Sequence, residues 1–149
     1  MSILKSPAQH PSLYYYVPLI GLSLNGRRLA VLATSLEMKL TGFGGTIVDS
    51  GSTIMLLVEP AFKALKKAVL GTVKLPVANR TVEDYKLCFE LPSGVGMGAV
   101  QAPALVLHFD GGAEMVLPRD NYLHATTTNR FVGVGEAMTR PYKSICRGG

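Results

Sequence analysis

The 149-residue sequence has no tryptophan, only two cysteines and few charged residues, which make up 17% of the chain. Low charge combined with 48% hydrophobic residues excludes a chain that is disordered throughout. No apolar run approaches the ~20 residues that a membrane-spanning helix needs, so we expect no membrane insertion. Two cysteines in a chain of this length say little about the redox compartment. The sequence therefore predicts a globular chain with a sizeable core.

Positive charge exceeds negative charge, with a formal net charge of +5, yet the basic residues are scattered. The pair Arg27-Arg28 and the group Lys63, Lys66 and Lys67 are short and have no interleaved aromatic residues. Such groups are typical of a solvated surface, and we expect no nucleic-acid partner. The three histidines and two cysteines lack the spacing of metal ligands, so we also expect no metal site and no cofactor.

The first residues, Met1 to Lys5, do not form the charged start and apolar core of a secretory signal. On this basis the chain is either cytosolic or a piece of a longer precursor. Asn79-Arg80-Thr81 fits the N-glycosylation acceptor pattern, which matters only if the chain enters the secretory pathway. These residues therefore leave the localisation open.

Glycine, proline, valine, leucine and threonine are abundant, a composition that favours strands and turns. Asn25-Gly26 predicts a tight hairpin, because both residues tolerate positive φ. A second hairpin is expected where the alternating segment 104–109 turns at Asp110-Gly111-Gly112. Pro60 opens a predicted helix with one apolar face, and Gly71 is its expected C-terminal cap. Further strands are expected over 14–24, 27–32, 46–48, 54–58, 85–91, 113–117 and 121–125.

One segment carries chemistry: the apolar strand Thr46-Ile47-Val48 delivers Asp49 to a turn that contains Gly51 and two nearby serines. Glycine lets the backbone come close, and hydrogen bonds from Ser52 and from turn amides favour an ionised carboxylate. Asp-Ser-Gly alone is also what an ordinary turn contains. The wider order of features is much rarer: an apolar strand, Asp-Ser-Gly-Ser-Thr, a second apolar strand, then Glu59-Pro60 and a helix.

The segment Gly45-Thr46-Ile47-Val48-Asp49-Ser50-Gly51-Ser52-Thr53 resembles the second active-site motif of plant pepsin-like aspartic proteases of the nepenthesin type. It matches the family's pattern, Gly-Thr-Ile-[Ile/Val]-Asp-Ser-Gly-[Thr/Ser]-Thr, at every position. Other segments are similar to landmarks of the C-terminal lobe in that family, and the likeness runs from about Leu4 to Thr126. These segments are Tyr15-Tyr16-Val17, Gly21 to Gly26, Glu59-Pro60-Ala61-Phe62, Leu87-Cys88-Phe89, Pro103 to Phe109 and Leu117 to Tyr122.

The resemblance implies a mainly β fold, the pepsin-like C-terminal lobe, a barrel-like arrangement of six strands with one or two short helices. It also implies that two aspartates share one proton across a lobe interface and activate a water molecule against a peptide carbonyl. Asp49 carries over as one member of that pair. Ser50 carries over as the residue that bonds across to the other lobe, and Ser52 as the hydroxyl that orients the Asp49 carboxylate. Gly51 and Thr53 carry over as supporting parts of the loop.

The sequence departs from the family pattern in two respects. It contains a single Asp-[Ser/Thr]-Gly motif, so the first aspartate of the pair is not in it. The family also pairs the cysteine that matches Cys88 with one soon after the Asn-Tyr segment, whereas Cys146 comes later, which leaves a Cys88–Cys146 disulfide as one possibility. Because the likeness fades after Thr126, we expect a lobe over residues 1–125 and a divergent, irregular tail over 126–149.

In the family an apolar-apolar-Gly strand passes beside the active-site loop. Phe131-Val132-Gly133 imitates this element in composition but not in its surroundings. Without such a strand the Asp49 loop would be unsupported and a sheet edge exposed, so the lobe is expected to be incomplete at its C-terminal end. Such an ending is typical of a truncated or differently spliced product.

Other chemistry is not supported by the residue pattern. The glycine-rich segments 42–45 and 94–98 do not lie between a strand and a helix, as phosphate-binding loops do. No Gly-x-Ser-x-Gly elbow surrounds Ser50 or Ser52, and nothing in the sequence places His10, His108 or His124 beside them. A serine nucleophile at either position is therefore not expected.

Three hypotheses of different kinds remain. The chain is half of an aspartic endopeptidase for peptide or protein substrates, inactive alone unless two copies pair their Asp49 residues. Alternatively, it is a non-catalytic binding protein, since it is also similar to the C-terminal domain of plant xylanase inhibitors. The third hypothesis is a truncated product without activity. The family resemblance implies an extracellular or secretory location, and the sequence indicates no oligomeric state.

Overall fold

The computed structural model describes residues 15–41, 44–49, 55–80, 82–83, 85–134, 136–137 and 144–147, with the backbone alone at 49, 136–137 and 144–147. Strands predominate in this part of the chain, and its α-helix is α1 (Glu59–Thr72). Short 3-10 helices lie in the connections: η1 (Ala33–Ser35), η2 (Met97–Ala99), η3 (Asp110–Gly112) and η4 (Arg119–Asn121). The mainly β class expected from the sequence is confirmed.

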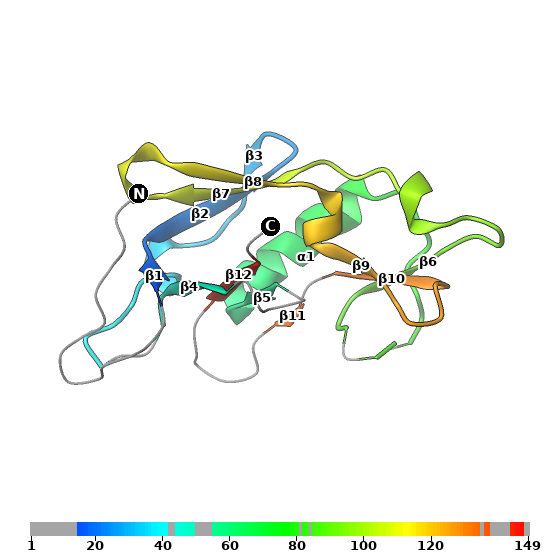
Figure 1. Cartoon of the computed structure of the whole chain (residues 1–149), viewed down its shortest axis with the longest axis horizontal. Coiled ribbons are helices and arrows are strands. Elements are labelled where there is room, and N and C mark those ends of the chain that lie inside the picture. The colour runs from blue at the N-terminus through cyan, green and yellow to red at the C-terminus, as the bar shows by residue number, and fades with distance from the viewer. Residues whose placement is uncertain are drawn as a thin grey trace.

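The described strands form three sheets. A five-stranded sheet has the order β1 (Tyr16–Val17), β4 (Thr46–Asp49), β12 (Ser144–Arg147), β5 (Leu56–Leu57) and β11 (Glu136–Ala137). A four-stranded sheet has the order β3 (Arg27–Arg28), β2 (Leu19–Leu24), β7 (Leu105–Phe109) and β8 (Glu114–Leu117), and a three-stranded sheet has β6 (Cys88–Glu90), β10 (Phe131–Val134) and β9 (Leu123–Ala125). Figure 1 shows the four-stranded and three-stranded sheets toward opposite ends of the molecule, with α1 running between them.

Both predicted hairpins are present. β2 turns into β3 at Asn25 and Gly26, whose φ values of 53° and 72° are those that the tight turn requires. β7 and β8 pair in antiparallel register across the turn at Asp110–Gly112. Local turn chemistry therefore accounts for two of the three contacts within the four-stranded sheet.

The helix begins where the sequence predicts and ends slightly later. Pro60 lies in the first turn of α1, where its missing N–H costs nothing. Gly71, the expected C-terminal cap, lies inside the helix instead, and Val73 follows the last helical residue with its N–H donating to the Val69 carbonyl. A cap with a left-handed backbone is not needed, because Val73 leaves the helix in an extended conformation.

The core joins α1 to the four-stranded sheet. The inner side of α1 buries Ala61, Phe62, Leu65 and Val69 in one hydrophobic cluster. The same cluster contains residues of β2 and β7. Along β7 buried and half-buried residues alternate, as expected for a strand with one buried face, whereas β2 is buried at nearly every position. These β residues are Leu19, Leu22, Leu24, Leu105, Leu107 and Phe109.

The prediction of an irregular tail over 126–149 is wrong where the structure describes that segment. β10, β11 and β12 all lie in it, and β10 is buried along its length between β6 and β9. The turn that starts β10 has Asn129 at a φ of 52°, and the Thr126 N–H donates to the Phe131 carbonyl. Asn129 and the apolar run after it were thus a turn-and-strand signal that the sequence reading missed.

A carboxylate from a distant loop holds this turn. Glu83, itself at a φ of 53°, accepts hydrogen bonds from the Thr127 backbone N–H at 2.8 Å and from its hydroxyl at 2.7 Å. These bonds favour the ionised carboxylate and lower the pKa of Glu83 below its ordinary value. The contact connects residues 44 positions apart in the sequence.

Gly133 should be hard to replace. A Cβ atom there would lie 2.2 Å from the Tyr85 ring, and the ring base cannot move aside cheaply. We expect Gly133→Ala to lower the free energy of unfolding by about 1–3 kcal/mol in urea titrations. Gly96→Ala is the matched control, because its Cβ meets open space, and its change should stay within about 0.5 kcal/mol. Equal effects of the two substitutions would contradict this packing.

Glu83→Gln should flatten the acid limb of the stability profile. The depressed pKa of Glu83 means that its contribution is present above the unfolded value, about 4.3, and is lost as the pH falls through the folded value. The wild-type melting temperature should therefore exceed that of Glu83→Gln at about pH 6 and approach it at about pH 3. A constant difference between the two proteins across this range would show that the carboxylate charge is not what holds the turn.

Candidate active site

β4 brings Asp49 to the end of a strand that is fixed by its neighbours. Thr46 and Ile47 are buried, and they pair with Val17 and Tyr16 of the antiparallel strand β1. On its other side β4 pairs in parallel with β12, in a register that sets Arg147 opposite Asp49. The strand that carries the predicted catalytic residue is therefore paired on both sides, and Asp49 itself is paired with β12.

The loop after Asp49 joins two strands that flank a third. The sheet order β4-β12-β5 shows that β12 occupies the place between the strand before the loop and the strand after it. The side chain of Asp49 and the residues Ser50, Gly51, Ser52 and Thr53 lie outside the described part of the structure. Their assigned roles therefore remain predictions. The strands on either side of the loop, β4 and β5, are described, and we call these strands with β1 and β12 the frame of the site.

In the family an apolar-apolar-Gly strand lies beside the active-site loop, and Phe131-Val132-Gly133 imitates it in composition. That segment is not the strand that lies beside β4. Phe131-Val132-Gly133 lies in β10, which pairs with β6 and β9. β12 takes the position beside β4, with Ile145 opposite Ile47 in the parallel register. β4, the strand that leads into the Asp49 loop, therefore has a neighbour on each side, whereas the loop lies outside the described residues and its support stays a prediction.

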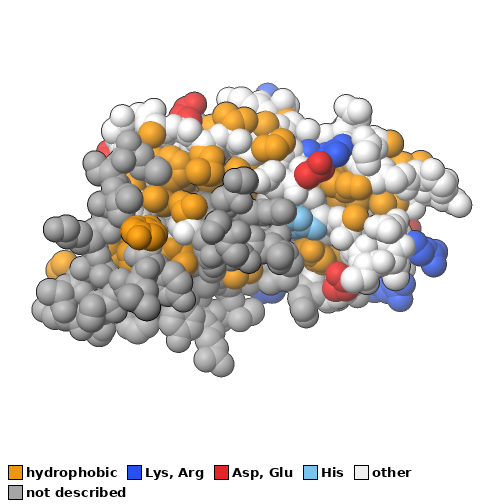
Figure 2. Space-filling view, viewed as in Figure 1, with side chains coloured by type: hydrophobic (Ala, Val, Ile, Leu, Met, Phe, Trp, Pro, Cys, Tyr) orange, Lys and Arg blue, Asp and Glu red, His pale blue; other side chains and the backbone are white. Residues whose placement is uncertain are grey.

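A cavity of about 580 Å³ lies beside the start of β4. Its walls come from β1, the first residues of β2 and the segment around Leu36, and Figure 2 shows hydrophobic side chains over the part of the molecule where β1 and β2 lie. Thr46 is among the residues that line this cavity, and its hydroxyl is buried and has no hydrogen-bond partner. An unpaired buried hydroxyl costs stability.

The two cysteines do not settle the predicted disulfide. Cys88 is a buried free thiol whose pKa is raised mainly by burial, which makes it a poor nucleophile. Its direct neighbour across the sheet is Gly133 of β10. The side chain of Cys146 lies outside the described part of the structure, so the pairing of the two stays a prediction.

Asn79 is exposed on a loop, where a glycosylation acceptor has to be, and its modification likewise stays a prediction. No group of three potential metal ligands is found among the described residues. No described helix is long and apolar enough to cross a membrane.

A hydrogen-bonded row that the sequence did not reveal crosses the four-stranded sheet. The Ser23 hydroxyl lies 2.7 Å from Nε2 of His108, and Nδ1 of His108 lies 2.9 Å from a carboxylate oxygen of Glu114. Hairpin register alone would place His108 opposite Glu114, as the structure does. The pairing of β2 with β7, which brings Ser23 to His108, joins residues 85 positions apart and has no local signal.

This row has the order of a nucleophile, a base and an orienting acid, but the described residues around it do not resemble a hydrolytic site. Ser23 is only 8% exposed. The cavities beside β4 and on either side of α1 are lined by other residues. Acyl transfer needs space for a carbonyl carbon and donors for its oxygen next to the nucleophile. We therefore interpret the row as a cross-strand support of the sheet.

Comparisons with known proteins show which family the chain belongs to. The family described as "Xylanase inhibitor C-terminal" matches residues 14–143. The chain is 36% identical to aspartic proteinase nepenthesin-1 from Nepenthes gracilis over 110 residues, 73% of this chain and 24% of the relative. It is also 36% identical to aspartyl protease family protein 2 from Arabidopsis thaliana, over 78% of this chain and 23% of that protein.

The chain belongs to the xylanase inhibitor C-terminal family. The resemblance to plant nepenthesin-type aspartic proteases, expected from the Asp49 motif, is thereby confirmed. The match continues to residue 143, beyond the point at which the likeness seemed to fade. The chain spans about a quarter of the length of these curated relatives, 24% of the first and 23% of the second.

Two solved structures have the same fold as this member of the xylanase inhibitor C-terminal family. The crystal structure of edgp superposes with a TM-score of 0.73 at 15% identity, over 98% of this chain and 39% of that one. Basic 7S globulin from soybean superposes with a TM-score of 0.67 at 16% identity, over 98% of this chain and 37% of that one. The pepsin-like fold class is therefore confirmed.

Ser23→Ala tests whether the hydrogen-bonded row is structural. We expect it to lower the free energy of unfolding by about 0.5–1.5 kcal/mol, because Nε2 of His108 loses its partner. The purified chain should not be labelled by a fluorophosphonate probe, since Ser23 is buried and lines none of the cavities described above. Labelling that is present in the wild type and absent from Ser23→Ala would instead make Ser23 a nucleophile.

Proposed function

We propose that this chain supplies one carboxylate, Asp49, of a paired-aspartate aspartic endopeptidase. The observation that carries the proposal is the position of Asp49 at the end of a strand clamped between β1 and β12, in a chain related to plant aspartic proteases. A fixed backbone at this point is what a shared-proton pair needs, because two carboxylates must be held close together to split their pKa values.

In this mechanism the second aspartate comes from another lobe. The ionised aspartate takes a proton from a water molecule as the water oxygen attacks the peptide carbonyl carbon. The protonated aspartate donates its proton to the carbonyl oxygen, and the resulting intermediate collapses with protonation of the leaving amine. Ser52 is assigned to orient the Asp49 carboxylate, and Ser50 to bond across the interface. Gly51 and Thr53 complete the loop.

The isolated chain is proposed to be inactive. A single carboxylate cannot both take a proton from water and give one to the carbonyl oxygen, and the sequence holds one Asp-Ser-Gly motif. Pairing of two copies through their Asp49 residues is the route by which the chain alone would gain activity. A substrate bound between lobes would be a peptide or protein, in an acidic extracellular or secretory setting.

A second candidate is a non-catalytic binding protein. The description of the matching family, "Xylanase inhibitor C-terminal", favours it directly. In a binding protein of this kind the strands around β4 keep their arrangement but no proton is transferred. Asp49 is then not needed for binding. Binding of a glycoside hydrolase that survives Asp49→Ala would establish this function. A product without activity, the third hypothesis, would show neither proteolysis nor such binding.

A complementation assay tests the proposed function. The purified chain alone should not cleave fluorescent casein at about pH 4. Mixed with a separately expressed nepenthesin-type N-terminal lobe carrying the Asp-Thr-Gly motif, it should give pepstatin-sensitive cleavage. Asp49→Asn should lower that cleavage by about 10²- to 10⁴-fold, because one member of the acid–base pair can no longer ionise.

The control for this assay is Lys39→Glu, a surface change outside the Asp49 strand, which should retain the restored activity. Far-ultraviolet circular dichroism and melting temperature must match between Asp49→Asn and the wild type, so that loss of fold is separated from loss of chemistry. Full casein cleavage by the Asp49→Asn mixture would refute the catalytic assignment.

A further inference from the structure

The outer side of α1 carries most of the helix's charge. Its buried residues point into the core, whereas Lys63, Lys66, Lys67 and Leu70 follow one another at helical spacing on the remaining surface. Lys74, two residues after the helix, donates a hydrogen bond to the Gly71 carbonyl and so stays close to the helix end. The helix thus presents a row of ammonium groups with an apolar side chain among them.

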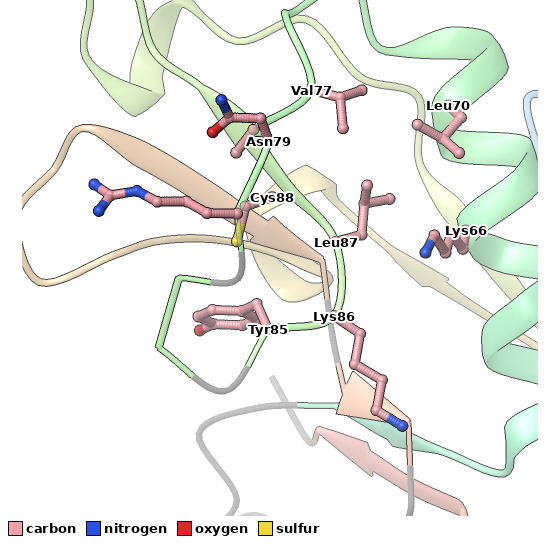
Figure 3. Close-up of a pocket in the computed structure, with 10 residues that line it drawn as sticks. Lys66, Leu70, Val77, Asn79, Tyr85, Lys86, Leu87 and Cys88 are labelled. Carbon is pink, nitrogen blue, oxygen red and sulfur yellow. The ribbon is translucent and has the colours of Figure 1, made fainter.

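A cavity of about 300 Å³ lies between α1 and the segment 77–88. Lys66 and Leu70 line it from the helix, and Val77, Lys86 and Leu87 line it from the opposite side. Figure 3 shows the Lys66 ammonium group turned toward Leu87, with Leu70 and Val77 beside the same opening. Leu70 is 42% exposed and Val77 is 51% exposed, so the apolar part of this cavity is open to a ligand.

A second cavity, of about 550 Å³, lies on another side of the helix, between α1 and the β2–β3 hairpin. Lys67 lines it from the helix, and Arg27 and Arg28 line it from the hairpin. Small helix residues, Ala64 and Ala68, form its floor. The two cavities therefore flank one helix, and each is rimmed by cations.

Few negative charges offset these cations in the described structure. No acidic side chain lines either cavity. Glu59 in the first turn of α1 is bound by the Lys63 ammonium group at 2.8 Å. That bond, and to a smaller extent the charge of Lys86, lowers the pKa of Glu59. We call this surface the α1 basic face; it comprises Arg27, Lys63, Lys66, Lys67, Lys74 and Lys86.

We propose that the α1 basic face binds an acidic peptide segment of a partner protein, with its carboxylates on the cations and an apolar side chain in the smaller cavity. Charge complementarity selects a partner of negative charge. The exposed Leu70 and Val77 favour a peptide over a uniformly charged polymer, because a peptide can bring an apolar side chain to cover them. The surface lies on α1, apart from the Asp49 strand, so the inference does not rest on the proposed function.

Fluorescence anisotropy with a labelled Glu-Glu-Leu-Glu-Glu-Leu-Glu-Glu peptide tests this site on the full chain. We expect saturable binding that weakens as sodium chloride rises from about 50 to about 300 mM. The double substitution Lys66→Glu with Lys86→Glu should weaken binding by about 10-fold or more, since it reverses charges on both walls of the smaller cavity. Lys39→Glu with Arg130→Glu, which changes the net charge equally outside the face, should have little effect.

Two further comparisons separate the peptide from other anions. Leu70→Ala should weaken binding of the leucine-containing peptide, but not of the same peptide with serine in place of leucine. Asp49→Asn should bind as the wild type does, whatever the result of the protease assay. Equal weakening by the two charge-reversal pairs, or tighter binding to heparin or to phosphatidylserine vesicles than to the peptide, would overturn the proposal.

Discussion

The pairing of β4 with a strand on each side is the constraint on which the rest of the site depends. β1 comes from the start of the described chain and β12 from its end, so the position of Asp49 is set by contacts across nearly the whole sequence. The strand propensity of the residues in β4 cannot fix the position of the Asp49 backbone, since a strand of four residues is not stable alone. The site therefore exists only in the folded lobe.

The helix α1 shows how one element can serve the core and the surface at once. Its inner residues fill the space against the four-stranded sheet, and Leu65 and Val69 are completely buried there. Because a helix turns every 3.6 residues, burying one side leaves the cations between these positions on the other. The packing that stabilises the fold thus also arranges the α1 basic face.

The elements that the sequence predicts well are those whose signals are local. Asn25-Gly26 and Asp110-Gly111-Gly112 specify turns through their own backbone preferences, and α1 follows from a proline and an apolar period. The parallel register of β12 on β4 has no such signal, because parallel pairing depends on residues far apart in the chain. The motif likewise reveals Asp49, whereas the Ser23–His108 contact is specified only by the pairing of β2 with β7.

The same frame can serve a protease and a binding protein, because the frame and the chemistry rest on different residues. Buried residues such as Thr46 and Ile47 hold β4 in its sheet whatever follows in the loop. Proton transfer needs an ionisable side chain at the strand end and a partner carboxylate facing it, both of which can be lost without disturbing the core. A family can therefore keep the fold while its members differ in activity. For this chain the unaltered Asp49-Ser50-Gly51 sequence is the feature that favours the protease, since a pure binding protein has no need to keep it.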